Sequence, residues 1–499
     1  MDKVKSKFAK GAALMVAARM SVKFLGLIST LILVRLLTPR DFGIVALGTG
    51  IVATLELLRT FGFQAALISD QEAGPEKYDT AWTINLAVAL LLAAVLVLIS
   101  RSVGEIYDEP TLSTVIQMLA IGVVIRGCEN IGIVDLRKNL EFDREFIFIL
   151  SKKLAGFCVT VSLAFVLRSY WALVFGMLAS SMTATLMSYY MSSRRPWFSL
   201  AAFKELFSFS SWILINQALM FVRHRSADFV IGKVVSTSAV GIYSVSYEIS
   251  HMVTSEVIAP VNRAAMPAYA KMKGQAGVLE RSYLQVISLI AMLIVPVTFG
   301  IAATAPIFVP ILLGENWLEA VPIIQILAFA GGLMALETNS GTAYVSLGMP
   351  KLNVMAYLVF VPVLLSSMYF LVPEHGALGA AWSSLIASIA TLPVHLYLLR
   401  RYLGLSLLGF AAVFVRPLLA GVAMFAIVRA IVDFFEADPA LSGTLLALAA
   451  CVVAGAAVYS VVVLACWYAA SRPAGAETML LEQVGKRLRK RKQPMQPDD

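Results

Sequence analysis

The segment TAWTINLAVALLLAAVLVLISR, residues 80–101, contains no charged side chain before Arg101. A helix needs about 20 predominantly apolar residues to cross the hydrocarbon core of a bilayer, and this segment supplies them. Similar runs follow one another along the chain, separated by short polar loops. The segment therefore predicts a membrane-spanning helix, and its recurrence predicts an all-α protein that crosses the membrane many times.

The composition agrees with this interpretation. Of the 499 residues, 59% are hydrophobic and only 14% are charged, whereas a soluble domain carries about 25% charged residues. The net charge is +9, but no interleaved basic and aromatic surface indicates a nucleic-acid partner. The four cysteines lie in apolar runs without the spacing of metal ligands, so neither a metal site nor a disulfide is expected.

Fourteen spans are predicted, with Lys and Arg concentrated in alternate loops. This asymmetry places both termini on the cytoplasmic side, and the expected location is the inner membrane of a bacterium. One loop, residues 69–79, is predicted inside although it is acidic, and the short piece Ile307 to Leu313 is predicted as a loop or re-entrant turn. The spans are 10–35, 43–68, 80–101, 112–136, 146–167, 170–192, 207–232, 239–265, 282–304, 319–347, 352–372, 377–399, 407–432 and 441–470.

An internal repeat organises these spans. The segment RLLTPRDFGIV at residues 35–45 is matched by KVVSTSAVGIY at 233–243, a constant offset of 198 residues. Both units start on the same side of the membrane, which predicts a parallel pseudo-repeat of two lobes. The expected organisation is a six-helix lobe over 1–193, a second over 194–402, two extra helices over 403–471, and a basic cytoplasmic tail over 472–499.

Charges inside the spans are the candidate functional residues, because each costs about 2.5–3.5 kcal/mol on insertion. They gather in the repeated spans one, two, seven and eight, which predicts a central cavity between the lobes. The spacing of three residues predicts intrahelical pairs between Glu56 and Arg59 and between Arg225 and Asp228. The cations predicted to bind an anionic substrate are Arg19, Lys23, Arg59, Arg223, Arg225 and Arg263.

Acidic residues and a histidine in the same spans form a second group. Glu56, Asp228, Glu248 and His251 are candidates for charge pairing or for ion or proton coupling. Structural roles stay open beside these functional ones: lysines and arginines near span ends can snorkel to the interface, and a histidine can be an ordinary hydrogen-bonded interior residue. No catalytic residue and no cofactor is predicted, and Na+, H+ or the membrane potential is the expected source of coupling energy.

Several stretches resemble a known family. They are Phe24 to Gly43, Gly62-Phe63, Gly314-Glu-Asn-Trp317 with Pro322 to Leu327, and Gly348-Met-Pro350. They resemble the polysaccharide-transporter family of the MOP flippase superfamily, in particular the Wzx-type O-antigen and exopolysaccharide repeat-unit flippases. The resemblance implies fourteen helices, a V-shaped cavity, and an undecaprenyl-diphosphate-linked oligosaccharide as substrate. It also implies functional arginines on spans one, two and eight, where Arg19, Arg59 and Arg263 lie.

The expected function is therefore translocation of lipid-linked repeat units by alternating access, for exopolysaccharide, O-antigen or capsule biosynthesis. The expected partners are the lipid-linked oligosaccharide, the bilayer, and a polymerase and chain-length regulator of the same pathway. Three alternatives remain: a lipid II flippase, a MATE-type multidrug exporter, and a membrane polysaccharide polymerase or ligase. The excess of arginine disfavours an exporter of cationic drugs, while short external loops without an Asp-x-Asp motif disfavour an enzyme.

Overall fold

The computed structural model describes residues 2–57, 67–68, 70, 72–203, 211–436, 445–471 and 478. Across these residues the chain is helical, with no β-strand. It divides into two compact units, residues 1–244 and 245–499. The long helices of the first unit are α1 (Asp2–Leu36), α2 (Pro39–Glu56), α4 (Pro75–Ile106), α5 (Pro110–Gly127), α7 (Phe142–Leu167), α8 (Trp171–Met191) and α10 (Ser211–Val234).

Helix α11 (Thr237–Lys271) begins in the first unit and continues into the second. Short helical turns lie between the long helices, among them α6 (Val134–Lys138). The second unit continues with α12 (Ala276–Phe308), α13 (Ala320–Ser346), α14 (Lys351–Leu403), α15 (Leu407–Glu436) and α16 (Leu445–Ala469). The boundary between the two lobes, placed at residue 193 from the sequence, stays a prediction. The boundary between the two compact units lies after residue 244.

The structure confirms an all-α, multi-pass membrane protein. Within the described residues, ten helices are long and apolar enough to cross a bilayer. One of them, α14, is bent at Gly376, whose φ of 59° and ψ of −138° interrupt the helix, so its two parts match the predicted spans 352–372 and 377–399. Three further long helices, α2, α10 and α11, also carry charged residues. Fourteen spans are consistent with this arrangement.

The repeated segment at residues 35–45 forms a helix start. Thr38 caps α2, and its backbone N–H donates to the Asp41 carboxylate at 2.9 Å. The Asp41 N–H donates in return to the Thr38 hydroxyl at 3.4 Å, which completes a capping box. Pro39 occupies the first turn, where its missing N–H costs nothing. The sequence thus fixes where α1 ends and α2 begins.

The glycines of the two repeats meet in the first unit. A Cβ atom built on Gly43 would lie 1.8 Å from the Thr237 carbonyl oxygen, and one built on Gly241 would lie 1.8 Å from the Pro39 carbonyl oxygen. Pro39 and Thr237 are themselves separated by the repeat offset. Gly43 contacts Thr237, and Gly241 contacts Pro39, the counterpart of Thr237 in the first repeat. The two contacts are therefore equivalent, as expected for a local two-fold axis.

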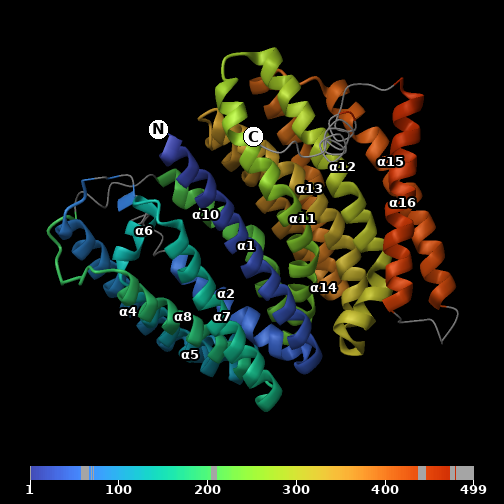
Figure 1. Cartoon of the computed structure of the whole chain (residues 1–499). Helices are drawn as coiled ribbons and strands as arrows, with labels where there is room; N and C mark the ends of the chain where they lie inside the picture. Colours follow the sequence, from blue (N-terminus) through green and yellow to red (C-terminus); the bar gives the residue numbers. More distant parts are fainter. Residues whose placement is uncertain are drawn as a thin grey trace, which may run out of the picture. The chain divides into compact units, whose positions relative to one another are not determined.

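The first unit packs as a bundle through small residues. Helices α4, α5, α7 and α8 run alongside one another (Figure 1), with α1 on α7 and α2 on α5. At the α7–α8 contact, a Cβ on Gly176 would lie 1.7 Å from the Thr160 hydroxyl. Close backbone approach through small residues is how helices associate in lipid, where no hydrophobic driving force acts between them.

The second unit has α12 at its centre, in contact with α13, α15 and α16 (Figure 1). Its interior includes buried polar groups that pair with each other. The Asn339 amide donates to the Asn262 carbonyl oxygen at 2.8 Å, and Tyr283 and Ser340 share a hydrogen bond of 3.0 Å. These bonds join α11, α12 and α13 inside a region where an unpaired polar group would be costly.

One short segment was predicted wrongly. Residues 307–313 are neither a loop nor a re-entrant turn: α12 runs to Phe308 and continues as a π-helical turn, Val309–Leu313. The helix then stops at Gly314, whose φ of 100° suits glycine. Trp317 follows, fully buried, so the apolar run is an extension of the span.

Loops predicted to lie outside the membrane meet at one end of the first unit. Arg40 donates two hydrogen bonds to the buried Glu109 carboxylate, at 3.0 and 2.9 Å. The Tyr170 N–H donates to Asp41 at 3.0 Å, and the Lys233 ammonium donates to the Ile106 carbonyl at 2.8 Å. Four loops that the predicted topology places on one side are thus held together.

The Arg40–Glu109 pair gives stability a pH dependence. Burial acts to raise the pKa of Glu109, but hydrogen bonds from Arg40 and Thr111 and the charge of Arg40 outweigh it and hold the pKa below the ordinary 4.5. A lowered pKa gives stabilisation that is complete above the ordinary value and is lost as pH falls through the lowered one. Glu109→Gln should therefore melt below wild type at pH 7, by a gap that shrinks below about pH 4.

Thermal unfolding of the purified protein across pH measures this gap. Glu105→Gln is the matched control, since the Glu105 side chain is exposed in the same loop region. A gap that stays constant from neutral to acidic pH would show that ionisation of Glu109 does not stabilise the fold.

Candidate functional site

Two of the predicted cations lie on α1. Arg19 and Lys23 are one turn apart and both are exposed, whereas Ala18, directly before Arg19, is buried. Lys23 also interacts with neighbouring groups. The spacing of four residues gives them a common face, as predicted. A membrane-spanning helix that exposes two cations on one face needs an anion, water or another polar group beside it.

A third cation approaches the same face from α7. A Cβ built on Gly26 would lie 3.8 Å from the Lys153 ammonium nitrogen, and Gly26 follows Lys23 by three residues and so shares its face. Lys153 is the twelfth residue of α7, about 16 Å along the helix. Lys153 was not among the cations predicted from the sequence to bind an anion, so this approach to α1 was missed.

On α2, Glu56 pairs with an arginine of another helix. The Arg126 guanidinium of α5 donates to the Glu56 carboxylate at 2.9 Å. Arg59, the predicted intrahelical partner, lies outside the described residues. Arg126 was not among the residues predicted for the site. Glu56 therefore links α2 to α5, and its charge compensates that of at least one arginine within the spans.

On α10, the predicted pair is confirmed. Arg225 donates to Asp228 at 3.1 Å, and the Asp228 side chain is only 5% exposed. Arg223 and His224 are half-buried on the same helix and both interact with neighbouring groups. Arg223, one of the cations predicted to bind an anionic substrate, is thus not an isolated charge.

Helices α10 and α2 pack against each other through glycine. Phe229 lies 3.3 Å from a Cβ built on Gly50, and Leu47 lies 2.9 Å from one built on Gly232. Arg225, Phe229 and Gly232 follow a spacing of four and three residues, which is one helical face. The Arg225–Asp228 pair is therefore carried on the side of α10 that is turned toward α2.

The predicted residues of α11 differ in exposure. His251 is 8% exposed, stacks on Tyr247 with ring centroids 3.8 Å apart, and has Nδ1 3.1 Å from the Tyr247 carbonyl oxygen. Glu248 and Arg263 are exposed, and the Arg263 Nε atom donates to the Ala259 carbonyl at 3.2 Å. His251 thus fits the structural alternative, while Glu248 and Arg263 remain candidates with exposed side chains.

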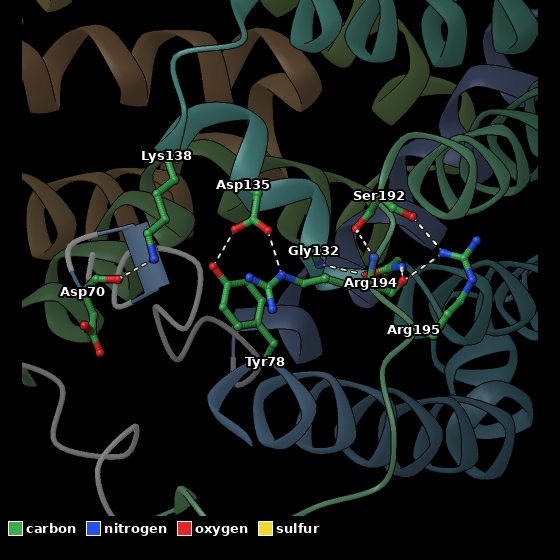
Figure 2. A network of polar contacts seen from close by, with 9 residues as sticks. Asp70, Tyr78, Gly132, Asp135, Lys138, Ser192, Arg194 and Arg195 are labelled. Carbon is green, nitrogen blue, oxygen red and sulfur yellow. Dashed lines mark hydrogen bonds and ion pairs between the residues drawn. The ribbon is translucent and has the colours of Figure 1, made fainter. Parts of the chain in front are cut away.

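A polar network ties together the opposite end of the first unit, where loops predicted to be cytoplasmic meet (Figure 2). Asp135 accepts hydrogen bonds from Tyr78, at 2.5 Å, and from the Arg194 guanidinium, at 2.7 Å. Lys138 donates to the Asp70 carbonyl at 2.7 Å. The network therefore joins the segment before α4, the turn at α6 and the residues after α8.

The acidic loop at residues 69–79, which the charge rule fitted poorly, belongs to this network. A hydrogen bond from Lys77 at 2.8 Å lowers the pKa of the Asp70 carboxyl. Lys138 on α6 and Arg194 after α8 supply further positive charge next to the loop (Figure 2). Asp70 is thus paired with Lys77 inside the loop, and cations of the neighbouring loops lie next to it.

The sequence shows to which family this chain belongs. The profile of the family described as "Polysaccharide biosynthesis protein" matches residues 32–322, more than half of the chain. The chain belongs to this family. The matched range runs from the last turns of α1 through the start of α13, and so it includes the repeated glycines and the paired residues of α2 and α10.

Two curated members of polysaccharide pathways are similar over most of their length. The lipopolysaccharide biosynthesis protein WzxC of Escherichia coli (strain K12) is 24% identical, with 72% of this chain and 75% of WzxC covered. The teichuronic acid biosynthesis protein TuaB of Bacillus subtilis (strain 168) is 25% identical, with 74% of this chain and 77% of TuaB covered. This member of the family is therefore similar, over about three quarters of its sequence, to proteins named for lipopolysaccharide and teichuronic acid biosynthesis.

The fold is also that of a solved flippase. The lipid II flippase MurJ in an inward closed conformation matches 92% of this chain and all of its own length, with a TM-score of 0.75 and 10% sequence identity. At this identity the likeness shows the fold alone. It places the polysaccharide biosynthesis family member described here in the MurJ-like class of multi-pass helical proteins.

Proposed function

We propose that this protein moves a lipid-linked oligosaccharide, carried on undecaprenyl diphosphate, across the bacterial inner membrane for surface polysaccharide biosynthesis. The observation that carries the proposal is the cationic face of α1, where Arg19 and Lys23 are exposed and Lys153 approaches from α7. A diphosphate satisfies such a face, because guanidinium groups bind phosphate oxygens bidentately and ammonium groups act as point charges. Membership of the polysaccharide biosynthesis family supports the choice of an oligosaccharide as cargo.

The mechanism is alternating access without covalent chemistry. The diphosphate binds the α1 cations from the cytoplasm, the sugars enter the polar interior, and the polyprenyl chain stays in lipid. A negative potential inside the cell favours outward movement of the anionic headgroup by about 2.3 kcal/mol per charge for each 100 mV. Glu248, whose side chain is exposed, is the candidate that we propose for ion or proton coupling, while Asp228 belongs to the buried pair with Arg225 at 3.1 Å.

Removal of the α1 cations tests the proposal. Arg19→Gln with Lys23→Gln should lower export at least about 10-fold, since each lost charge-assisted hydrogen bond costs about 1.5–3 kcal/mol. The measurement is surface polysaccharide in cells that lack the chromosomal copy, together with accumulation of the lipid-linked precursor. Arg35→Gln, at the other end of α1, is the matched control. Full export by the double variant at normal protein level would refute a cationic substrate site on α1.

Orientation in the membrane is a separate part of the proposal, with both termini in the cytoplasm. A single cysteine at Glu315, exposed in the turn after the π-helix, should react with an impermeant thiol reagent from the periplasm. A cysteine at Lys273, in the turn before α12, should react only after the membrane is opened. The background must lack native cysteines, because Cys158 is exposed. The reverse labelling pattern would invert the topology.

A further inference from the structure

A groove between α12 and α15 in the second unit has no role in the transport scheme above. Its volume is about 760 Å³. On α12 it is lined by Arg281, Leu284, Gln285 and Ser288, and on α15 by Gly409, Ala412, Val413, Val415 and Arg416, with Ala470 after α16. Both sets follow the spacing of one helical face. We call this feature the α12–α15 groove.

The groove combines an apolar wall with two cations. Among the described residues that line it, Arg281 and Arg416 are the charged ones and none is acidic. The acid next in sequence, Glu280, accepts a hydrogen bond from the Ser406 N–H at 2.7 Å, so it is committed to the turn before α15. The Nε atom of Arg416 is buried. The electrostatic character of the groove is therefore positive.

Its depth matches the headgroup boundary of a bilayer. Arg281 is five residues past the start of α12 and Arg416 nine residues past the start of α15, about 8 and 13 Å along the helices. Ala470, just beyond the end of α16, lines the same groove. In the predicted topology this end faces the cytoplasm, whose leaflet carries the anionic lipids, and basic pockets between spans on that side bind their headgroups.

We propose that the α12–α15 groove binds an anionic phospholipid, with its phosphodiester on Arg281 and Arg416. Gln285 and Ser288 supply donors for ester and glycerol oxygens, while Leu284 and Val413 contact the first carbons of the acyl chains. A Cβ built on Gly409 would lie 3.4 Å from Leu284, an ordinary van der Waals distance, so α12 and α15 approach each other closely beside the groove. The site is separate from the cations of α1 and holds whether or not the protein transports an oligosaccharide.

Binding of phosphatidylglycerol to the purified full-length protein, followed by native mass spectrometry, tests the site. We expect phosphatidylglycerol to be retained over phosphatidylcholine, and Arg281→Gln with Arg416→Gln to weaken its binding at least about 10-fold, because two charge-assisted contacts are lost. The matched control is Arg429→Gln, which removes another arginine of α15 that is paired with Asp433 at 2.9 Å. It should bind as wild type does.

A second variant tests the site independently, in case the double glutamine variant fails to fold. Ala412→Trp fills the groove without removing a charge and should also displace phosphatidylglycerol. The lysine variant, Arg281→Lys with Arg416→Lys, should restore most of the binding. Phosphatidylglycerol binding that is unchanged in both the glutamine and tryptophan variants would overturn the proposal. So would arginine-dependent binding of undecaprenyl diphosphate without binding of phosphatidylglycerol, which would assign the groove to the carrier.

Discussion

Alanine at Gly43 or Gly241 is expected to destabilise the protein by at least about 3 kcal/mol, at the upper end of overpacking costs. Either Cβ would lie 1.8 Å from a carbonyl oxygen of the opposite helix. The carbonyl oxygen is a backbone atom, and the Cβ atom is bonded directly to the backbone. No rotamer change can therefore relieve the clash, and the two helix starts must separate. Unfolding of the purified variants and surface polysaccharide in cells measure the two consequences.

The double variant sharpens this prediction. If Gly43 and Gly241 form one contact, the separation forced by the first alanine makes room for the second. The two costs should then be less than additive, as for residues that share a contact. Gly277→Ala is the control, because no atom lies within 4 Å of a Cβ built there. Wild-type stability and export in Gly43→Ala would show that the helices do not meet as described.

Loss of the Arg225 side chain is the second large effect expected. Arg225→Met leaves the Asp228 carboxylate, 5% exposed, as a buried charge without its salt bridge. Breaking a buried pair from one side costs about 3–5 kcal/mol, whereas removing both charges is often neutral. Arg225→Met should therefore reduce folded protein strongly, and Arg225→Met with Asp228→Leu should recover most of it. Thermal unfolding in detergent measures both.

A second intrahelical pair provides the comparison. Arg429 and Asp433 on α15 lie 2.9 Å apart with side chains 38% and 58% exposed. Exposed pairs contribute about 0–1 kcal/mol, so Arg429→Met should change stability little. Equal effects of Arg225→Met and Arg429→Met would contradict the view that burial of Asp228 makes the α10 pair costly to break.

Much of the fold could be predicted from local pattern. Long apolar runs indicate spans because the bilayer fixes their length, and the spacing of Arg225 and Asp228 indicates their pair because an α-helix fixes which residues adjoin. The constant offset between Gly43 and Gly241 indicated two equivalent units. It did not show that the two glycines contact each other, since a repeat specifies equivalence and not proximity.

The candidate site was harder to predict from the sequence, because its contacts connect distant parts of the chain. Glu56 pairs with Arg126, 70 residues later, and Lys153 approaches Gly26 from another helix. No periodicity encodes which helices are neighbours, so the sequence could place these charges in spans but could not pair them. The π-helical turn after Phe308 was missed for a related reason: a short apolar run does not show whether it continues a helix.

The reciprocal contact at Gly43 and Gly241 bears on how such a chain could arise. In a symmetric dimer of one ancestral subunit, a single substitution at this position would have inserted two side chains at once, one from each copy. Mutation there would have been doubly penalised. After duplication and fusion, each half of such a chain could change independently. In this chain glycine stands at the position in both repeats, where the geometry admits no side chain from either.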